Sequence, residues 1–143
     1  CRPMTPEDTL ARLNAGLPPV VHSERGRAVG WAPERRELRM AYQIGPEFCF
    51  GGDIVQGGFV TAMLDAAMAH AVIAAEPQHP VRVASIDITV SFLRTARAGR
   101  FTAAGSIVKT GRTIGFLKAE LYDARDELVA TATSSVHLTR GHG

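Results

Sequence analysis

The chain is organised around one long apolar stretch, residues 57–75. Only Thr61, Asp65 and His70 interrupt an apolar surface that would otherwise continue around every side of a helix. Such a helix is one that other elements enclose. At about 1.5 Å per residue it would be roughly 28 Å long, and the acid in its middle argues against a membrane span. Burying a lone carboxylate there costs several kcal/mol unless something compensates, so Asp65 is the first candidate functional residue.

The rest of the pattern predicts a short helix and a set of strands. Thr5, followed by Pro6 and two acids, begins a peripheral helix over residues 5–15, whose simplest interpretation is an edge cover without chemistry. Alternating apolar and polar positions predict the strands. These strands cover residues 20–32, 36–44, 84–92, 101–109, 113–122 and 128–138, and residues 47–55 form a loop that leads into the long helix.

The strand that follows the long helix shows two distinct faces, of which the apolar one is expected to point into the core. The apolar face comprises Ala84, Ile86, Ile88, Val90 and Phe92, and the polar face comprises Ser85, Asp87, Thr89 and Ser91. Tight turns join the later strands. The predicted fold is therefore α+β, with a twisted antiparallel sheet of five to six strands wrapped around the central helix in one domain over residues 1–143.

Composition narrows the possible functions. A formal charge of +2, with basic residues spread along the chain, gives no reason to expect a nucleic-acid partner. Cys1 and Cys49 form no CxxC pair and no metal-ligand spacing, so neither a disulfide scaffold nor a metal site is expected. The start of the chain shows no signal-peptide apolar core, and a cytoplasmic protein without a membrane partner is the default expectation.

Five short segments between residues 37 and 138 carry motifs that are more specific than composition. They are Gly51 to Gly58 followed by Met63-Leu64-Asp65, Ile88 to Gly99, and Gly111-Arg112 together with Leu128 to Thr133. These motifs resemble those of the hotdog-fold acyl-CoA thioesterases, and more narrowly the phenylacetate-degradation subgroup. The resemblance implies a hotdog fold and an enzyme that hydrolyses an acyl-CoA to a free acid and CoA. It implies no metal or redox cofactor, because coenzyme A is part of the substrate.

Two positions depart from that family. Many relatives carry His immediately before the paired glycines, where this chain has Gln56. Gln can donate a hydrogen bond to a carbonyl oxygen, but it does not titrate near neutrality. Some relatives also have Asn where Phe50 stands here. Gln56 therefore suits a role in orienting the thioester, and the polar contact at position 50 is missing.

The resemblance assigns roles to residues of the central helix. The N–H group of Gly57 at the helix start polarises the thioester carbonyl, supported by the Gln56 amide, and Gly58 and Thr61 border the substrate. Asp65 acts either as a general base toward water or as a nucleophile that forms a mixed anhydride. The alternative for Asp65 is a structural carboxylate that bonds across a subunit interface.

The spacing of Gly57 and Asp65 bears on assembly. Eight residues of helix separate them by about 12 Å, which is too far for both to hold one thioester. The resemblance implies that Gly57 of one subunit lies opposite Asp65 of another, so a homodimer is expected as the active form, with a homotetramer as the open alternative.

Further candidates lie around these residues. Relatives use a hydroxyl near Ser85 to position the attacking water, although Ser85 equally fits the polar face of a sheet. Thr61 could bond to the Asp65 carboxylate, or back to its own helix as helical Thr commonly does. His70 lies about 140° around the helix from Asp65, which places it outside the site.

Basic residues near strand ends are candidates for the phosphates of acyl-CoA, with solvated surface charge as the alternative. They are Arg94, Arg97, Arg100, Lys109 and Arg112, and the favoured pair is Lys109 and Arg112, which flank Gly111. Two rival functions remain: a hotdog module that binds acyl-CoA without cleaving it, and a dehydratase or hydratase acting on a related thioester. The latter usually pairs Asp with a His that neither Gln56 nor His70 supplies. Aromatic, short-chain and medium-chain acyl groups all stay open.

Overall fold

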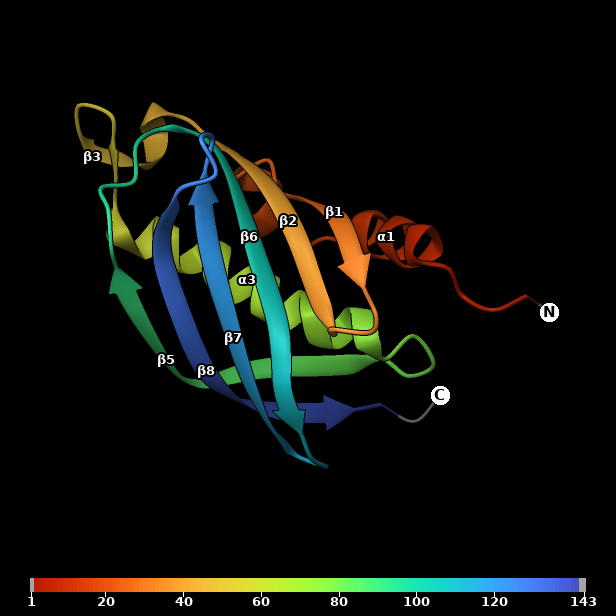
Figure 1. Cartoon of the computed structure of the whole chain (residues 1–143). Coiled ribbons are helices and arrows are strands. Elements are labelled where there is room, and N and C mark those ends of the chain that lie inside the picture. The colour runs from red at the N-terminus through yellow and green to blue at the C-terminus, as the bar shows by residue number, and fades with distance from the viewer. Residues whose placement is uncertain (1, 142–143) are drawn as a thin grey trace.

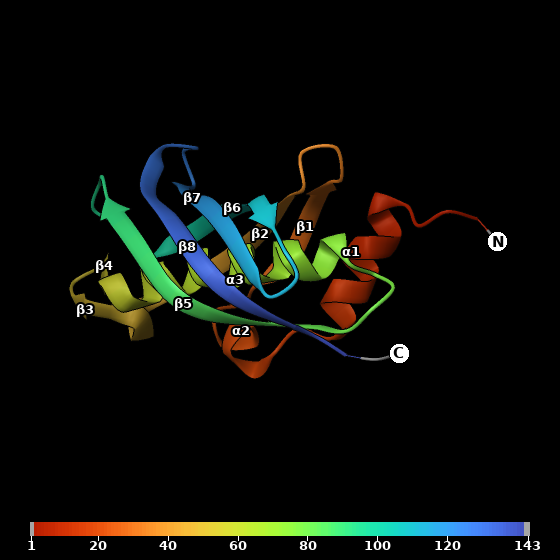
Figure 2. The same cartoon turned by 90° about the horizontal axis from the view of Figure 1, so that it is seen from below.

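The computed structural model describes residues 2–141, so Cys1 lies outside the described residues. The sheet that dominates it has six strands in the order β1-β2-β6-β7-β8-β5, with every neighbouring pair antiparallel. It curves around helix α3, which lies against its concave side (Figures 1 and 2). The predicted α+β architecture, with one long helix inside an antiparallel sheet, is confirmed.

The elements follow one another along the chain with short connections. They are α1 (Pro6–Ala15), α2 (Pro19–Ser23), β1 (Arg27–Ala32), β2 (Glu37–Ile44), the 3₁₀ turn η1 (Pro46–Phe48), β3 (Cys49–Gly51), β4 (Ile54–Val55), α3 (Gly57–Ala75), β5 (Val81–Phe92), β6 (Gly99–Thr110), β7 (Ile114–Asp123) and β8 (Leu128–Arg140). Strands β3 and β4 form a small separate hairpin immediately before α3.

Helix α3 has the predicted bounds, residues 57–75, and packs closely on the centre of the sheet. The closest approach is at Gly105 of β6, where a Cβ atom would lie 2.3 Å from the carbonyl oxygen of Ala67. Only glycine fits there. The helix is long and apolar enough to pass for a membrane span by length and composition. Nine of its residues are buried, so its apolar composition is explained by its position in the core of this fold.

Helix α1 confirms the predicted N-terminal helix and covers one end of α3. A reciprocal capping box begins it: the Thr5 side chain accepts a hydrogen bond from the Asp8 N–H, and the Asp8 carboxylate accepts one from the Thr5 N–H. From its last turn, Arg12 donates a hydrogen bond of 3.0 Å to the carbonyl oxygen of Ile73. α1 therefore supplies a cap to the C-terminal end of α3.

The prediction of one strand over residues 20–32 is wrong in its first half. Pro19 occupies the first turn of α2, where its fixed φ favours a helix and its missing N–H is not needed. Arg25 then adopts a positive φ of 51°, and Gly26 packs against Val21 and Tyr42 with no room for a Cβ. The strand begins only at Arg27, after this turn.

The predicted faces of residues 84–92 are also wrong in part, because β5 contains a bulge. The pairing with β8 shifts between Ser85 and Asp87, so Ile86 is left out of the ladder and is 58% exposed. Before the bulge, Val81 and Val83 face the core, and after it Ile88 and Val90 do. A bulge inserts one residue and so reverses the phase of the alternation. Ser85 thereby belongs to the core-facing side.

Candidate functional site

The N-terminal end of α3 leaves backbone donors free. Gln56 is the N-cap residue, and its carbonyl oxygen accepts from Phe59 and Val60, which closes the first turn. Within residues 2–141, the N–H groups of Gly57 and Gly58 donate to no protein acceptor, and the Gln56 side chain makes no capping bond. Such a helix start carries a partial positive charge and binds an electron-rich oxygen.

A cavity of about 420 Å³ opens at this helix start. Its lining is mostly apolar and comes from β4, the start of α3, the end of β5 with the segment that follows it, and the start of β8. The lining residues are Ile54, Val55, Gly57, Val60, Phe92, Leu93, Arg94, Thr95, Ala96 and Val129. The ring of Phe92 lies over Gly57, where an added Cβ would come within 3.2 Å of its Cζ atom. The absence of a side chain at Gly57 therefore keeps space for both the ring and an incoming carbonyl group.

The structure brings Asp65 and Ser85 together. Asp65 lies two turns into α3, where it is half-buried, and the Ser85 hydroxyl donates a hydrogen bond of 2.9 Å to its Oδ1 atom. The bulge in β5 turns Ser85 toward α3, and Asp87 holds that bulge. The Asp87 carboxylate accepts from the Ser135 N–H at 3.0 Å, and its carbonyl oxygen accepts from the Ser134 hydroxyl at 2.7 Å. The sequence offered no signal for this bulge.

Gly57 and Asp65 do not share a cavity in one chain. Both lie on the uninterrupted helix α3, eight residues apart, and Asp65 is absent from the lining of the cavity at Gly57. A separation of about 12 Å along the axis is longer than a thioester group. Within one chain the candidate carbonyl-binding donor and the candidate carboxylate therefore form two separate candidate half-sites.

Two other polar residues of α3 are engaged by the helix itself. The Thr61 hydroxyl donates to the Gly57 carbonyl oxygen at 2.9 Å, the back-bonding alternative anticipated for a helical Thr. His70 is buried, and its Nδ1 atom is 2.8 Å from the Ala66 carbonyl oxygen. Burial lowers the pKa of His70, so it is neutral at pH 7. Neither residue contacts Asp65 among the hydrogen bonds of residues 2–141.

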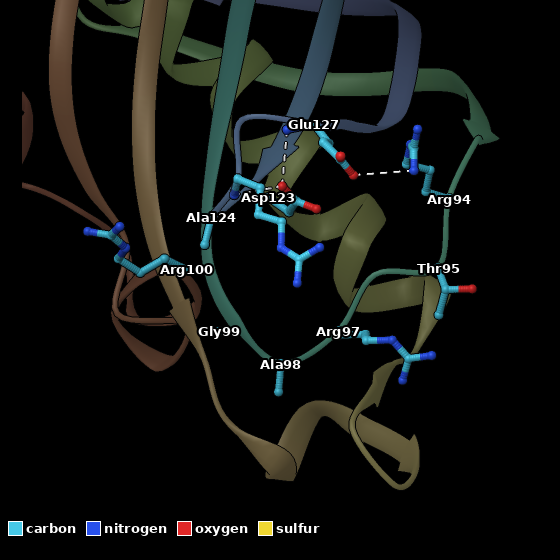
Figure 3. Close-up of a pocket in the computed structure, with 10 residues that line it drawn as sticks. Arg94, Thr95, Arg97, Ala98, Gly99, Arg100, Asp123, Ala124 and Glu127 are labelled. Carbon is cyan, nitrogen blue, oxygen red and sulfur yellow. Dashed lines mark hydrogen bonds and ion pairs between the residues drawn. The ribbon is translucent and has the colours of Figure 1, made fainter.

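A second cavity, of about 500 Å³, adjoins the first, and more arginines line it than line the first (Figure 3). It lies between the segment that joins β5 to β6 and the turn that joins β7 to β8. Arg94 and Thr95 line both cavities. Arg97, Arg100 and Arg125 line the second cavity only. Arg125 was not among the sequence candidates, because nothing in its turn distinguishes it from a solvated surface charge.

The favoured phosphate-binding pair lies elsewhere. Lys109, Gly111 and Arg112 belong to the β6–β7 hairpin, at the end of the sheet away from Gly57. Arg140 ties this hairpin to the C-terminal end of α3: it donates to the carbonyl oxygens of Gly111 and Arg112, and its Nε atom is 2.7 Å from a Glu76 carboxylate oxygen. In one chain this hairpin contacts the opposite end of the helix from the candidate carbonyl site.

One buried acid lies outside these half-sites. Glu24, 2% exposed, has a carboxylate oxygen without a hydrogen-bond partner in residues 2–141. Burial raises its pKa to about 7. The nearby Tyr42 hydroxyl donates to the Met63 carbonyl oxygen at 3.1 Å, and its pKa is raised by burial and by the charges of Glu24 and Asp65. The sequence gave no reason to single out Glu24, whose neighbours are polar.

Comparison with known proteins identifies the family. The family model of the thioesterase superfamily matches residues 52–130, more than half of the chain. The medium/long-chain acyl-CoA thioesterase YigI of Escherichia coli K12 is 28% identical over 133 residues, which cover 81% of this chain and 86% of YigI.

Solved structures give the same result. A phenylacetic acid degradation-related protein from Ralstonia eutropha JMP134 matches with a TM-score of 0.81 and 28% identity, covering 90% of this chain and 98% of that one. The E. coli PaaI protein matches with a TM-score of 0.78 over 94% of this chain and 92% of PaaI, and at 18% identity this likeness concerns the fold alone. The resemblance to hotdog-fold thioesterases of the phenylacetate-degradation type is thus confirmed.

Proposed function

Because the chain belongs to the thioesterase superfamily, we propose that it hydrolyses acyl-CoA thioesters to a free acid and CoA. The observation that carries this proposal is the start of α3, where the Gly57 and Gly58 N–H groups have no acceptor within residues 2–141 and an apolar cavity opens beside them. A thioester carbonyl placed there accepts a hydrogen bond from Gly57. Negative charge grows on that oxygen as the carbonyl carbon is attacked, and the helix N-terminus stabilises it.

In the proposed reaction, the partner subunit's Asp65 acts on the opposite side of the carbonyl. As general base it takes a proton from the attacking water, and as nucleophile it attacks the carbon itself and forms an anhydride that water then cleaves. In both routes water adds across the C–S bond, and the products are a carboxylic acid and the CoA thiol. Ser85 holds the Asp65 carboxylate in place through its 2.9 Å hydrogen bond.

The proposed assembly is a homodimer in which two such sites are completed. Strand β5 is the edge of the sheet. It exposes Ile86 and Phe92 by 58% and 57%, and Leu93, directly after it, is 54% exposed. A long edge strand with exposed apolar residues is a surface that a second chain covers. The chain's own elements also leave one stripe of α3 only half-buried, although an all-round apolar sequence predicted full enclosure. Its members are Ala62, Asp65, Ala66, Ala69 and Ile73. These two surfaces are continuous through Asp65 and Ser85, which supports a partner at the catalytic carboxylate.

The acyl group is proposed to be aliphatic. Ile54, Val55, Val60 and Val129 line the cavity at Gly57 with branched apolar side chains. The relative YigI carries the name medium/long-chain acyl-CoA thioesterase. Medium-chain and long-chain acyl-CoA are therefore the first substrates to assay, with phenylacetyl-CoA as the aromatic comparison.

The proposal is tested by CoA release from this panel, followed with a thiol-detecting dye, for the wild type, Asp65→Asn and Ser85→Ala. We expect release by the wild type, loss of about 10²–10⁴-fold in Asp65→Asn, and a smaller loss in Ser85→Ala, which keeps the carboxylate. Unchanged release in Asp65→Asn would contradict the assigned role. Tight binding of acyl-CoA without release by the wild type would instead indicate the non-catalytic binding module.

A further inference from the structure

A third cavity, of about 320 Å³, lies at the C-terminal end of α3, between the start of α1 and the turn that joins β1 to β2. Among the residues that the structure describes, it shares no lining residue with the two cavities near the start of α3. Gly57 and Ala75 are separated by about 27 Å along the helix axis. The proposed hydrolysis therefore gives this cavity no role, although its volume falls in the range of ligand cavities.

The wall of this cavity is mainly apolar and carries one aromatic side chain. Trp31, near the end of β1, is half-buried and packs against the core. Met4 and three prolines form much of the remaining wall, namely Pro6, Pro33 and Pro77. Because proline fixes its own backbone φ, this wall is held in shape without a ligand. An aromatic ligand packs on such a surface through an offset or edge-to-face contact with the indole ring.

The wall also carries an unpaired cation. Within residues 2–141, Arg36 is the one charged residue that lines this cavity. Its backbone is held on both sides, because its N–H donates to the Pro33 carbonyl oxygen and its carbonyl oxygen accepts from the Ile107 N–H, both at 3.2 Å. Arg35, next to it, pairs with Glu34 at 3.2 Å, whereas Arg36 makes no ion pair in the described part of the chain. The Arg36 guanidinium is therefore available to an anion.

The acids that flank the cavity along the chain leave this cation unneutralised. Glu7 lies about 160° around α1 from Thr9, which lines the cavity. The other flanking acids have cations of their own: Asp8 pairs with Arg2, Glu34 with Arg35, Glu37 with Arg39, and Glu76 with Arg140.

Thr9 adds a polar group without a partner. It is 3% exposed, and its N–H donates to the Thr5 carbonyl oxygen at 3.0 Å, but its hydroxyl makes no hydrogen bond within residues 2–141. The helical Thr61, by contrast, donates its hydroxyl to its own helix. Unlike the sealed carboxylate oxygen of Glu24, the Thr9 hydroxyl keeps exposed surface, so it opens to the cavity that Thr9 lines. A buried hydroxyl in this state points to a ligand that accepts its hydrogen bond.

We propose that this cavity binds a small aromatic carboxylate, as a ligand distinct from the thioester substrate. The ring packs against Trp31 and the prolines, and the carboxylate accepts hydrogen bonds from the Arg36 guanidinium and the Thr9 hydroxyl. Both of these groups donate, so they match a carboxylate and disfavour an ammonium group. The aliphatic acyl group proposed for the cavity at Gly57 belongs to a different class of ligand, which separates the two sites.

The test uses the fluorescence of Trp31, which is the only tryptophan of the chain and lines the cavity itself. The probes are hydrocinnamate, its neutral amide, and cyclohexanepropanoate, each titrated into the wild type. We expect a saturable change with hydrocinnamate at a Kd below about 1 mM. The amide lacks the charge and should bind at least about fivefold more weakly. The cyclohexyl acid lacks the aromatic ring and should bind about threefold more weakly.

Variants then assign the contacts. Arg36→Gln is expected to weaken binding of the acid at least about fivefold and to leave binding of the amide unchanged. Thr9→Val removes the hydroxyl from a side chain of similar shape and should weaken acid binding about threefold, whereas Thr9→Ser keeps the hydroxyl and should bind like the wild type. The matched control is Arg35→Gln, which removes the same charge at a neighbouring position outside the cavity lining and should bind like the wild type. Thermal unfolding checks that each variant is folded.

Three results would each overturn the proposal: no saturable change in the wild type, equal binding of the acid and the amide, or equal effects of Arg36→Gln and Arg35→Gln. Equal binding of the cyclohexyl acid would exclude the aromatic class and overturn it as well. Asp65 does not line this cavity, so Asp65→Asn is expected to bind hydrocinnamate like the wild type. A Kd raised as much by Asp65→Asn as by Arg36→Gln would place the probe at the proposed catalytic carboxylate instead. These measurements involve no hydrolysis, so their failure leaves the proposed function standing.

Discussion

At its C-terminal end α3 has its free carbonyl groups capped by the chain, whereas at its N-terminal end the free N–H groups have no acceptor within residues 2–141. Arg12 donates to the carbonyl oxygens of Ile73 and Ala74, and Arg140 joins Glu76 to the β6–β7 hairpin. At the N-terminal end Gly57 lines a cavity instead. Every helix leaves such groups at both ends, and a fold normally satisfies them.

The difference teaches that a helix end whose backbone N–H groups lack acceptors beside a cavity is a candidate ligand site, while an end whose carbonyl groups are hydrogen-bonded by the chain has a structural role. It also separates two uses of arginine. Arg12 and Arg140 hold backbone and carboxylate groups of their own chain, and Arg94 and Arg97 make only exposed, replaceable pairs. The same residue type therefore stabilises the fold at one end of α3 and is available to a substrate at the other.

The largest effect is expected at Asp65, in the half of α3 that carries the free end. Asp65→Asn keeps the shape of the side chain and its acceptance of the Ser85 hydroxyl, but it removes the proton acceptor. We expect kcat to fall by about 10²–10⁴-fold at an unchanged melting temperature. Steady-state kinetics and thermal unfolding of the same preparation measure both. A kcat of Asp65→Asn within threefold of the wild-type value would contradict a catalytic role for Asp65 in the N-terminal half of α3.

Glu24 tests whether a polar group without a hydrogen-bond partner always indicates a ligand site. Its unpaired carboxylate oxygen lies in the core, and Glu24 lines none of the cavities described above. Its pKa rises to about 7 in the folded chain from an ordinary value of 4.5. Below pH 4.5 both states are protonated and the burial carries no ionic penalty. As the pH rises from 4.5 to 7 the unfolded chain loses the proton first, so stability falls, and it levels off above pH 7.

Glu24→Gln removes this titration. Its free energy of unfolding, taken relative to that of the wild type, should therefore be about 3 kcal/mol higher at pH 8 than at pH 4. Urea unfolding at the two pH values measures the difference, and kcat is expected to stay unchanged. A stability difference that does not vary with pH would show that the buried carboxyl does not titrate in this range.

Gly57→Ala tests the free end by sterics. The N–H group is kept, but the new Cβ would lie 3.2 Å from the Phe92 ring, so the ring must shift into the cavity that receives the carbonyl group. We expect kcat/KM to fall about tenfold, less than when an oxyanion donor is deleted. The double variant with Phe92→Leu should recover part of that loss. An additive loss in the double variant would show that the ring is not the obstacle.

The smallest effect is expected at the satisfied end. Arg12→Met keeps the apolar stem and removes the donor to Ile73 and Ala74, which should lower the free energy of unfolding by about 1 kcal/mol without changing kcat or KM. Chemical denaturation and steady-state kinetics measure the two quantities. A loss of activity greater than the loss of stability explains would contradict the division between the two ends.

Much of this fold could be predicted from the sequence because its signals are local. The apolar surface of residues 57–75 and the capping residues around Thr5 each report on a short segment, and both helices have the predicted position. The prediction of a strand over residues 20–26 was wrong because Pro19 begins a helix there and Arg25 adopts a positive φ in the turn that follows. The predicted faces of β5 were wrong in part because the bulge depends on hydrogen bonds to Ser134 and Ser135, which lie far along the chain.

The candidate site divides in the same way. Gly57 and Asp65 are candidates from motifs on one helix, and Ser85 is a candidate only through the resemblance. The hydrogen bond between Ser85 and Asp65 was not predicted. The arginine cavity depends on two turns that meet in space, the segment around Arg97 and the turn with Arg125. No periodicity within either turn indicates the other. Long-range meetings of this kind are what sequence patterns leave open.

The central claim is that Gly57 of one subunit and Asp65 of its partner complete one site, and mixed dimers test it most directly. Asp65→Asn and Gly57→Val subunits, the latter with a side chain too large for the space under Phe92, are co-expressed with different tags and the mixed dimer is purified. In the mixed dimer one site combines the intact Gly57 with the intact Asp65, so about half of the wild-type activity per dimer is expected while both parent dimers are inactive. A mixed dimer as inactive as its parents would contradict the shared site.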